Sequence, residues 1–271
     1  MDDFDRFLTE DLNDEGDVTS DSIFNNEVAK AYVIAKEDCV IAGLEELKIV
    51  FNKTGLKIKL NFKDGDFVTK DAIVAIINGP IRSILKSERL ALNFICKMSG
   101  IASETKKLVD KCNAINPNIR IAATRKTTPG FRKYEKKAVV LGGGEAHRYG
   151  LYDAVLIKDN HIKGVGSVKK VIEIIKQKVT DKIIEIEVEN EQDAYTAAKM
   201  NVDIIMLDNF KPEKGEKIAK KIRNINSKIL IEISGEITPK NIVNYASFAD
   251  RISLGYLTHS IKSKNFSLEL V

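Results

Sequence analysis

The sequence has little of what several classes of protein require. Its 271 residues contain no tryptophan, only three cysteines and 7% aromatic residues. The cysteines, Cys39, Cys96 and Cys112, are widely spaced without a CxxC pair, which excludes a disulfide scaffold and a cysteine-type zinc site. No apolar run approaches the roughly 18 residues of a membrane-spanning helix. The acidic first residues lack the basic-then-apolar pattern of a signal peptide, so we expect a cytoplasmic protein with no membrane partner.

The charge distribution gives no sign of a nucleic-acid partner. Lysine and arginine number 43 against 39 acidic residues, a net charge of +4, and the basic residues are spread along the whole chain. Nucleic-acid-binding proteins concentrate basic residues on one face or arm and often stack bases on aromatic rings. The apolar content of 44% is instead typical of a globular protein, and the length fits one or two domains.

The first part of the chain is predicted to be an α+β unit. A helix is expected over residues 3–11, short β segments from 29 to 78 with clear alternation in 57–62, and a long helix over 81–112. We expect residues 1–105 to form a sandwich domain. The last residues, 260–271, are too few for another βα unit and are expected to join that domain.

From residue 118 onward, apolar runs alternate with amphipathic segments. This alternation predicts a parallel sheet with helices outside it. Either a closed or incomplete barrel or an open doubly wound sheet would fit. Because no GxGxxG motif follows the first strand, a dinucleotide fold is disfavoured, and we predict an α/β barrel over residues 106–259. The six expected strands lie in 119–124, 153–158, 183–188, 203–208, 229–234 and 250–255, and the clearest helices in 167–178, 191–199 and 212–224.

Cationic side chains follow or adjoin the first strands of the predicted barrel. The carboxyl ends of barrel strands carry the functional residues of such folds. Arginine binds carboxylates through a planar fork, and lysine supplies a mobile point charge. Several converging cations therefore indicate a multiply anionic ligand, and the alternative is solvated loop charge. The cations are Arg125, Lys126, His147, Arg148 and Lys158.

Acidic side chains lie on two neighbouring strands. Glu185 and Glu187 alternate on one face of an apolar strand, and Asp208 ends the next. A carboxylate at the end of a buried strand needs a metal or a cationic partner. Mg²⁺ takes one or two carboxylates together with substrate phosphates, so Glu187 and Asp208 are candidate magnesium ligands. The alternative is a salt bridge to Arg125 or Lys158.

Glycines follow the last two strands, at Ser234-Gly235 and at Gly255. Barrels often hold a phosphate on backbone N–H groups at this place. The histidines lack metal-site spacing, which argues against zinc, and no GxSxG elbow or Cys–His pair supports acyl transfer. The sequence thus predicts a phosphate site beside the cations.

Four motifs carry a resemblance to a known family. They are TRKTTPG at 124–130, GGGEAHR at 142–148, GLYD at 150–153 and LIKDNH at 156–161. With these motifs the chain closely resembles quinolinate phosphoribosyltransferases, and the likeness extends to 10–19, 88–102 and 255–260. The resemblance implies that quinolinate and phosphoribosyl pyrophosphate, with Mg²⁺, give nicotinate mononucleotide, CO₂ and pyrophosphate in NAD biosynthesis. It also implies a homodimer or higher homo-oligomer whose active sites are shared between subunits.

The same resemblance implies roles for individual residues. Lys126, His147 and Lys158 would be catalytic, and Glu187 and Asp208 would bind the ribose and metal side of the donor. The quinolinate carboxylates would be held by the first cations, with one arginine reaching in from the partner subunit. The full set implied to bind substrates is Arg89, Thr124, Arg125, Lys126, His147, Arg148, Lys158, Glu187, Asp208, Ser234, Gly235, Glu236, Leu254, Gly255 and Tyr256.

Two positions depart from the family pattern. Ala146 stands where the family often has asparagine, and Glu236 where it often has a second glycine, so that only the backbone N–H of Glu236 would help a phosphate. A paralogous branch associated with molybdenum transport shares part of the pattern, but KDNH at 158–161 favours the quinolinate enzyme. Two further hypotheses are a Schiff-base aldolase using Lys158 and a non-catalytic sensor of phosphorylated ligands.

Overall fold

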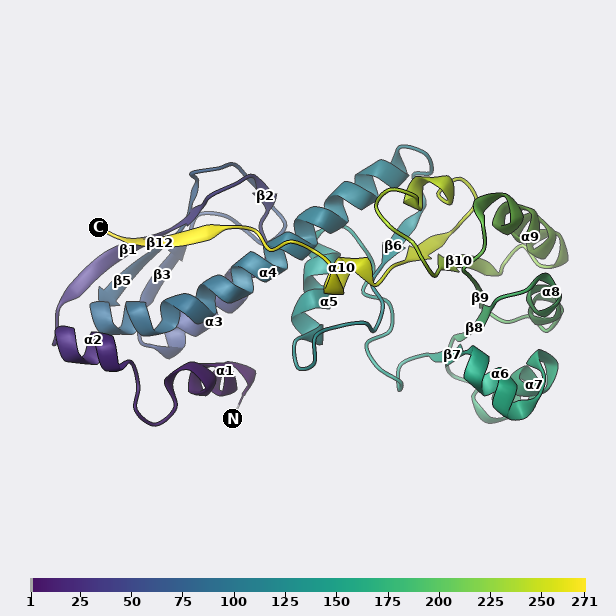
Figure 1. The fold of residues 1–271 in the computed structure, drawn as a ribbon, viewed down its shortest axis with the longest axis horizontal. Coiled ribbons are helices and arrows are strands. Elements are labelled where there is room, and N and C mark those ends of the chain that lie inside the picture. The colour runs from purple at the N-terminus through teal and green to yellow at the C-terminus, as the bar shows by residue number, and fades with distance from the viewer. Residues whose placement is uncertain (1) are drawn as a thin grey trace. The chain divides into compact units, whose positions relative to one another are not determined.

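The computed structural model describes residues 2–271, which divide into two compact units (Figure 1). The first unit holds the chain up to Glu104, residues 140–142 and the tail from Ile261. The second holds residues 105–139 and 143–260. The mixed α/β class predicted from the sequence is confirmed. None of the helices within residues 2–271 is long and apolar enough to cross a membrane.

The first unit is built on a four-stranded antiparallel sheet in the order β12-β1-β5-β3. The tail of the chain supplies β12, which pairs with β1 so that Leu268 lies opposite Val33. The predicted helices at both ends of this region and the strand in 57–62 are confirmed. The elements are α1 (Asp3–Leu12), α2 (Val18–Ile23), β1 (Val28–Ala35), β2 (Cys39–Val40), α3 (Leu44–Lys53), β3 (Lys57–Leu60), β4 (Phe67–Val68), β5 (Ile73–Pro80), α4 (Ile81–Asn113) and β12 (Phe266–Leu270).

The helix α3 corrects the prediction of β structure throughout residues 29–78. Leu44, Leu47 and Phe51, all buried, recur at the spacing of a helical face. Gly43 begins the helix in the left-handed region, with φ of 101°, and a Cβ there would lie 3.2 Å from the Cα of Ile95. The helical pattern extends over only 10 residues and is flanked by β segments on both sides, so the sequence alone does not distinguish it from them.

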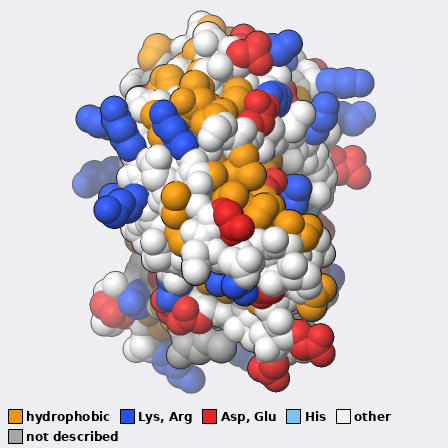
Figure 2. Space-filling model, turned by 90° about the vertical axis from the view of Figure 1, so that its left-hand side faces the viewer, with side chains coloured by type: hydrophobic (Ala, Val, Ile, Leu, Met, Phe, Trp, Pro, Cys, Tyr) orange, Lys and Arg blue, Asp and Glu red, His pale blue; other side chains and the backbone are white. Residues whose placement is uncertain are grey.

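One face of the sheet is buried at its central strands, β1 and β5, and the other face is only partly covered. Val33 and its neighbour Ala75 are buried, whereas Tyr32, Ile34 and Ile76 are half-buried. Burial alternates from one residue to the next, as expected for a strand that has one face toward a core. Figure 2 shows hydrophobic side chains gathered on the side of the molecule where this unit lies. The first unit therefore has apolar surface that its own core does not use.

The second unit contains six parallel strands in the order β6-β11-β10-β9-β8-β7. Each of the six predicted apolar runs contains one of them. Within residues 2–271, β6 and β7 do not pair with each other, so the barrel is open between them. The strands are β6 (Arg120–Ala122), β7 (Val155–Ile157), β8 (Ile184–Val188), β9 (Ile204–Asp208), β10 (Leu230–Ser234) and β11 (Arg251–Ser253).

Helices connect the strands and cover the outside of the sheet (Figure 1). They begin where side chains satisfy the first free backbone N–H groups: Ser167 caps α7 and Asn190 caps α8, while Pro212 opens α9. The apolar faces of α7, α8 and α9 are buried, so these three helices are fixed against the sheet. The helices are α5 (Arg132–Leu141), α6 (Asp159–Val165), α7 (Val168–Lys178), α8 (Glu191–Lys199), α9 (Pro212–Ile225), the 3₁₀ turn η1 (Ile242–Asn244) and α10 (Tyr256–His259).

The parallel register aligns the carboxyl ends of the strands along one edge. Ser234 lies beside Asp208, and Glu187 lies beside Met206, two residues before Asp208 on the neighbouring strand. Residues that follow strands far apart in the sequence are therefore brought to one edge of the second unit.

Candidate active site

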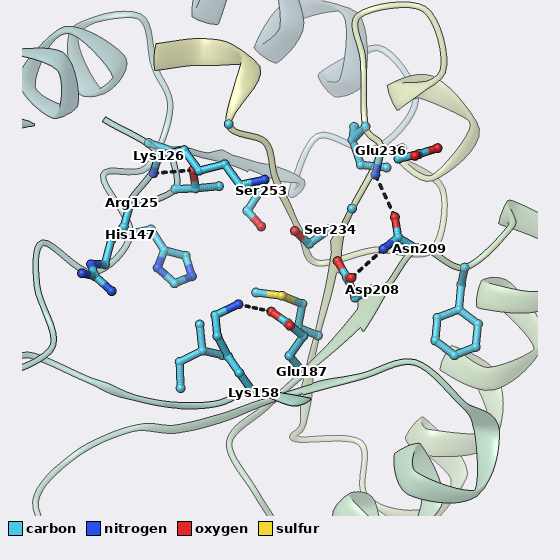
Figure 3. Close-up of a pocket in the computed structure, with 18 of the residues that line it drawn as sticks. Arg125, Lys126, His147, Lys158, Glu187, Asp208, Asn209, Ser234, Glu236 and Ser253 are labelled. Carbon is cyan, nitrogen blue, oxygen red and sulfur yellow. Dashed lines mark hydrogen bonds and ion pairs between the residues drawn. The ribbon is translucent and has the colours of Figure 1, made fainter. Parts of the chain in front are cut away.

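A cavity of about 960 Å³ opens at the carboxyl ends of the strands, entirely within the second unit (Figure 3). Its volume lies at the upper end of the range of about 300–1,000 Å³ that small-molecule pockets commonly span. Twelve of the residues predicted to bind substrates line it: Thr124, Arg125, Lys126, His147, Arg148, Lys158, Glu187, Asp208, Ser234, Gly235, Glu236 and Gly255.

The cationic side of the cavity holds arginines without acidic partners. Neither Arg125 nor Arg148 forms an ion pair within residues 2–271, and the buried Nε of Arg125 has no hydrogen-bond partner. Burial, and then the charge of Arg125, lower the pKa of Arg148. Two unpaired guanidinium groups in one cleft repel each other unless an anion lies between them. This side of the cavity is therefore suited to an anion.

Lys126 is exposed at the cavity, and its backbone is held from two directions. Its N–H donates to Thr124 Oγ1 at 3.1 Å, and its carbonyl accepts from the buried Thr258 hydroxyl at 2.7 Å. A Cβ on Gly255 would lie 2.8 Å from Cδ of Lys126. The absence of a side chain at Gly255 therefore leaves room for the methylene groups of Lys126, and Lys126 lines the cavity.

His147 stands between the cavity and two buried acids. Its backbone has φ of 54°, and its Nδ1 accepts the N–H of Arg148 at 2.8 Å. Its Nε2 lies 3.4 Å from a carboxylate oxygen of Glu185 and 3.4 Å from one of Glu232. Both ring nitrogens thus face protein groups, and the catalytic role assigned to His147 stays a prediction.

The protonation of His147 follows from these contacts. Burial lowers its pKa, but the two carboxylates outweigh burial and raise the pKa to about 9. The Arg148 N–H acts in the opposite direction, since it bonds only an unprotonated Nδ1. The pKa of His147 is still raised, because the effect of two buried carboxylates is larger than that of a single amide N–H. Glu232 also lies 3.0 Å from Nε of Arg251, so the acids below His147 are neutralised by cations.

The acidic side of the cavity combines an ion pair with a free carboxylate. Glu187 pairs with Lys158, which bears out the salt bridge considered as an alternative for these acids. Asp208 instead accepts a hydrogen bond from Nδ2 of Asn209 at 2.7 Å. Burial, and then the charge of Glu187, raise the pKa of Asp208. Both carboxylates lie at adjacent strand ends (Figure 3), where a cation would relieve their repulsion.

The ion pair of Lys158 also bears on the aldolase hypothesis. A lysine that forms a Schiff base must be a neutral nucleophile. The ammonium of Lys158 is instead held in an ion pair with the carboxylate of Glu187. The geometry of Lys158 and Glu187 therefore argues against Schiff-base chemistry at this residue.

The glycine loop after β10 is tightly built around Asn209. Gly235 has φ of 108°, and a Cβ on it would lie 2.3 Å from Oδ1 of Asn209. The same oxygen accepts the N–H of Glu236 at 3.1 Å. The Glu236 N–H is thus already bonded, which corrects the expectation that it would be available to a phosphate. The side chain of Glu236 is exposed.

Replacing Gly235 with alanine tests this loop. We expect the KM for the phosphorylated substrate to rise by at least about tenfold, because alanine is strained at this φ and its Cβ displaces Asn209. Gly164→Ala, on helix α6 with no heavy atom of the described chain near its would-be Cβ, is the control. Steady-state kinetics with each substrate varied would measure the effect, and equal KM values in the two variants would contradict it.

Three predicted substrate-binding residues do not line the cavity as residues 2–271 define it. Leu254 is buried, and its N–H donates to the Ala122 carbonyl at 3.1 Å, so that group is committed to the sheet. Tyr256 begins the short helix α10 beyond the strand. The third, Arg89, is an exposed residue of α4 in the first unit. The structure corrects Leu254, whereas the role of Tyr256 and the role of Arg89 in a partner's site stay predictions.

Several cavity residues were not predicted. Asn209 directly follows Asp208, so its position at a strand end was a usable signal. Asn241 and Tyr245 come from the irregular segment around η1, where no periodicity marks them. The unpredicted polar or charged residues of the lining are Asn209, Lys211, Asn241, Tyr245 and Ser253, and the apolar ones are Ala123, Leu156, Met206, Phe210 and Ile237.

The fold and the cavity together define an α/β-barrel enzyme that binds anionic small molecules at the carboxyl ends of its strands. Comparison with known proteins then gives the family. A model described as quinolinate phosphoribosyl transferase, C-terminal domain, matches residues 101–269, and the corresponding N-terminal domain model matches residues 17–99. The chain belongs to the quinolinate phosphoribosyl transferase family, which confirms the resemblance carried by the motifs.

Individual relatives agree with this assignment. The chain is 41% identical over 259 residues to the probable nicotinate-nucleotide pyrophosphorylase [carboxylating] of Archaeoglobus fulgidus, with 94% of this chain and 98% of the relative covered. The corresponding protein of Methanocaldococcus jannaschii is 44% identical, with 94% and 92% covered. The crystal structure of nicotinate-nucleotide pyrophosphorylase from Ehrlichia chaffeensis superimposes with a TM-score of 0.93 at 36% identity, covering 99% and 97% of the two chains.

Proposed function

We propose that this chain is a carboxylating nicotinate-nucleotide pyrophosphorylase, a phosphoribosyl transferase of NAD biosynthesis. It transfers the phosphoribosyl group of phosphoribosyl pyrophosphate to quinolinate, and the products are nicotinate mononucleotide, CO₂ and pyrophosphate. The observation that carries the proposal is the division of one cavity into a side with unpaired cations and a side with carboxylates and a glycine loop.

The cationic side matches quinolinate, a pyridine with two carboxylates. In the part of the chain that the structure describes, Arg125 and Arg148 form no ion pair with an acid, and Lys126 leaves its ammonium in the cavity. Two guanidinium forks and an ammonium can hold both carboxylates and fix the plane of the ring. The ring nitrogen is then directed toward the other side of the cavity.

The reaction needs positioning and charge more than a nucleophilic side chain. The bond from C1 of the ribose to pyrophosphate breaks, and the developing positive charge on the ribose faces the carboxylates of Glu187 and Asp208. The ring nitrogen donates its electron pair to C1. The adjacent carboxylate then leaves as CO₂, its bonding electrons stay on the ring carbon beside the positive nitrogen, and that carbon takes a proton from solvent.

Magnesium is the proposed cofactor. Asp208 has no cationic partner within residues 2–271, lies at a strand end beside Glu187, and offers the oxygen donors that Mg²⁺ prefers. Glu187 and Asp208 would hold the ion together with the phosphates of the donor. When bound, the ion supplies Lewis-acid stabilisation of the departing pyrophosphate.

We further propose a homodimer, or a higher homo-oligomer, in which Arg89 of one subunit completes the site of the next. The half-buried apolar side chains on the sheet of the first unit support assembly, since such surface is typical of interfaces. Arg89→Ala and Arg125→Ala chains should each be inactive alone and partly active when mixed and allowed to exchange. No recovery in the mixture would contradict a shared site.

The function is tested by its products. With quinolinate labelled at the 2-carboxylate, we expect label to appear as CO₂ in equal amount to nicotinate mononucleotide, and only when phosphoribosyl pyrophosphate is present. Nicotinate, which lacks the 2-carboxylate, is the matched control and should give no comparable turnover. Equal use of nicotinate, or donor binding without pyrophosphate release, would overturn the proposal and favour a related transferase or a sensor.

A further inference from the structure

The first turns of α5 carry charged side chains that the cavity does not use. Glu135 and Lys136 are both 0% exposed, and neither is among the residues that line the cavity in the described chain. Charged side chains are almost never fully buried unless they have partners. Their partners, and those of Arg132 on the same helix, are the two loops that hold the cations of the site.

Two residues of α5 bind the loop of residues 124–131, which carries Arg125 and Lys126. Glu135 accepts hydrogen bonds from both the N–H and the hydroxyl of Thr128, at 3.0 and 2.8 Å. Arg132 donates from Nε to Oγ1 of Thr127 at 3.0 Å. Three hydrogen bonds, one to a backbone N–H and two to side-chain hydroxyls, thus hold the two threonines directly after Lys126.

Two residues of α5 also bind the loop that carries His147 and Arg148. Lys136 donates from Nζ to the carbonyl of Ala146, and Nζ lies 5.3 Å from the centre of the Tyr149 ring. Arg132 donates from NH1 to the carbonyl of Tyr149 at 2.9 Å. The two cations of this loop are therefore held from both sides by donors on one helix.

These bonds act against a specific repulsion. The charge of Arg125 acts on Arg148, neither guanidinium forms an ion pair within residues 2–271, and like charges in a partly buried cleft tend to move apart. Arg132 contacts both loops, which ties them together at a fixed separation. Because the acceptors on the second loop are backbone carbonyls, the tie does not depend on which side chain stands at Ala146.

Lys136 is costly to bury. Burial, followed by the charge of Arg132, lowers its pKa to about 8. A methionine of similar volume would fill the same space without that cost. Stability alone therefore does not account for a lysine at this position, whereas fixing the Ala146 carbonyl does.

We propose that Lys136 and Arg132, assisted by Glu135, are positioning residues that set the distance between the two cationic loops for a ligand with two carboxylates. This inference rests on the proposed function, in which that ligand is quinolinate. None of the three touches the substrate. They act through Arg125 and Arg148, so their loss should weaken binding of quinolinate and leave binding of the phosphoribosyl donor unchanged.

The test compares Lys136→Met and Arg132→Met with Lys133→Met, an exposed lysine of the same helix. In the full-length enzyme, both test variants should raise the KM for quinolinate about tenfold or more, while the KM for the donor and the control's kinetics stay within twofold of the parent. A general loss of packing would instead raise both KM values together. Thermal unfolding of each variant monitors the fold.

The outcomes separate the two proposals. A quinolinate KM that is unchanged in both variants, or a donor KM that rises equally, would overturn the positioning role. If Lys136→Met does not fold, the partly exposed Arg132 decides, because its replacement leaves the core intact. A parent enzyme that fails to release CO₂ from quinolinate would refute the function instead, before any variant is compared.

Discussion

Replacing Arg148 with alanine is expected to lower kcat/KM for quinolinate by about a thousandfold, or about 4 kcal/mol. The guanidinium has no ion pair of its own within residues 2–271, so its hydrogen bonds are available to a carboxylate of the substrate. A charged hydrogen bond is worth about 1.5–3 kcal/mol, and a two-point fork makes two of them. Steady-state kinetics with quinolinate varied at saturating donor would measure the loss.

The fold should survive this change. Removing Arg148 also removes its repulsion with Arg125, so we expect thermal stability equal to or above that of the parent. Arg82→Ala is the matched control, because Arg82 is a surface arginine of the first unit paired with Asp21. Kinetics for Arg148→Ala that match those of this control would refute the cationic side as the quinolinate site.

Most of the barrel strands could be predicted because they are buried on both faces; β7, half-buried at Val155 and Leu156, is the exception. A strand such as β9, covered by helices outside and side chains inside, needs apolar residues throughout, which makes it visible as a continuous run. The parallel register then places the residue after each run at one edge. This rule was enough to bring Arg125, Lys158, Glu187 and Asp208 together before any coordinates.

The rest of the site depends on contacts that no local pattern encodes. Leu254 stands near the end of the last predicted strand and was expected to bind substrate, but the sheet uses its N–H. The position of Asn209 at a strand end can be seen in the sequence. Its hydrogen bond with the N–H of Glu236 can be seen only in the folded structure. The sequence did not indicate a function for Lys136, because its partner is the backbone carbonyl of Ala146, ten positions away, and no residue type marks such a contact.

Buried charges within the strands show a further limit. Glu185, Glu232 and Arg251 lie inside apolar strands, and each is nearly inaccessible. Only Glu185 drew attention in the sequence, as a carboxylate alternating with Glu187. β10 and β11 are consecutive in the chain and neighbours in the sheet, but it is their register that sets Arg251 opposite Glu232, and no apolar pattern encodes that register.

Replacing Asp208 with asparagine is the second change expected to have a large effect. The substitution keeps the size and shape of the side chain but removes the carboxylate that lies beside Glu187 and has no ion pair among the described residues. We expect kcat to fall by about a hundredfold or more and the Mg²⁺ concentration for half-maximal rate to rise, since two carboxylates bind the ion better than one. Initial rates over a magnesium series, at saturating quinolinate, would measure both.

A nearby acid supplies the control for Asp208→Asn. Glu189 is exposed, lies beyond the end of β8 and contributes to the field at Asp208, yet it is not among the residues that line the cavity in the described chain. Glu189→Gln should therefore leave both the rate and the magnesium requirement within twofold of the parent. If the two substitutions change the magnesium requirement equally, the change comes from the loss of one negative charge near the site, and Asp208 is not a magnesium ligand. A change confined to Asp208→Asn, with the quinolinate KM unaffected, would separate the donor half of the cavity from the cationic half.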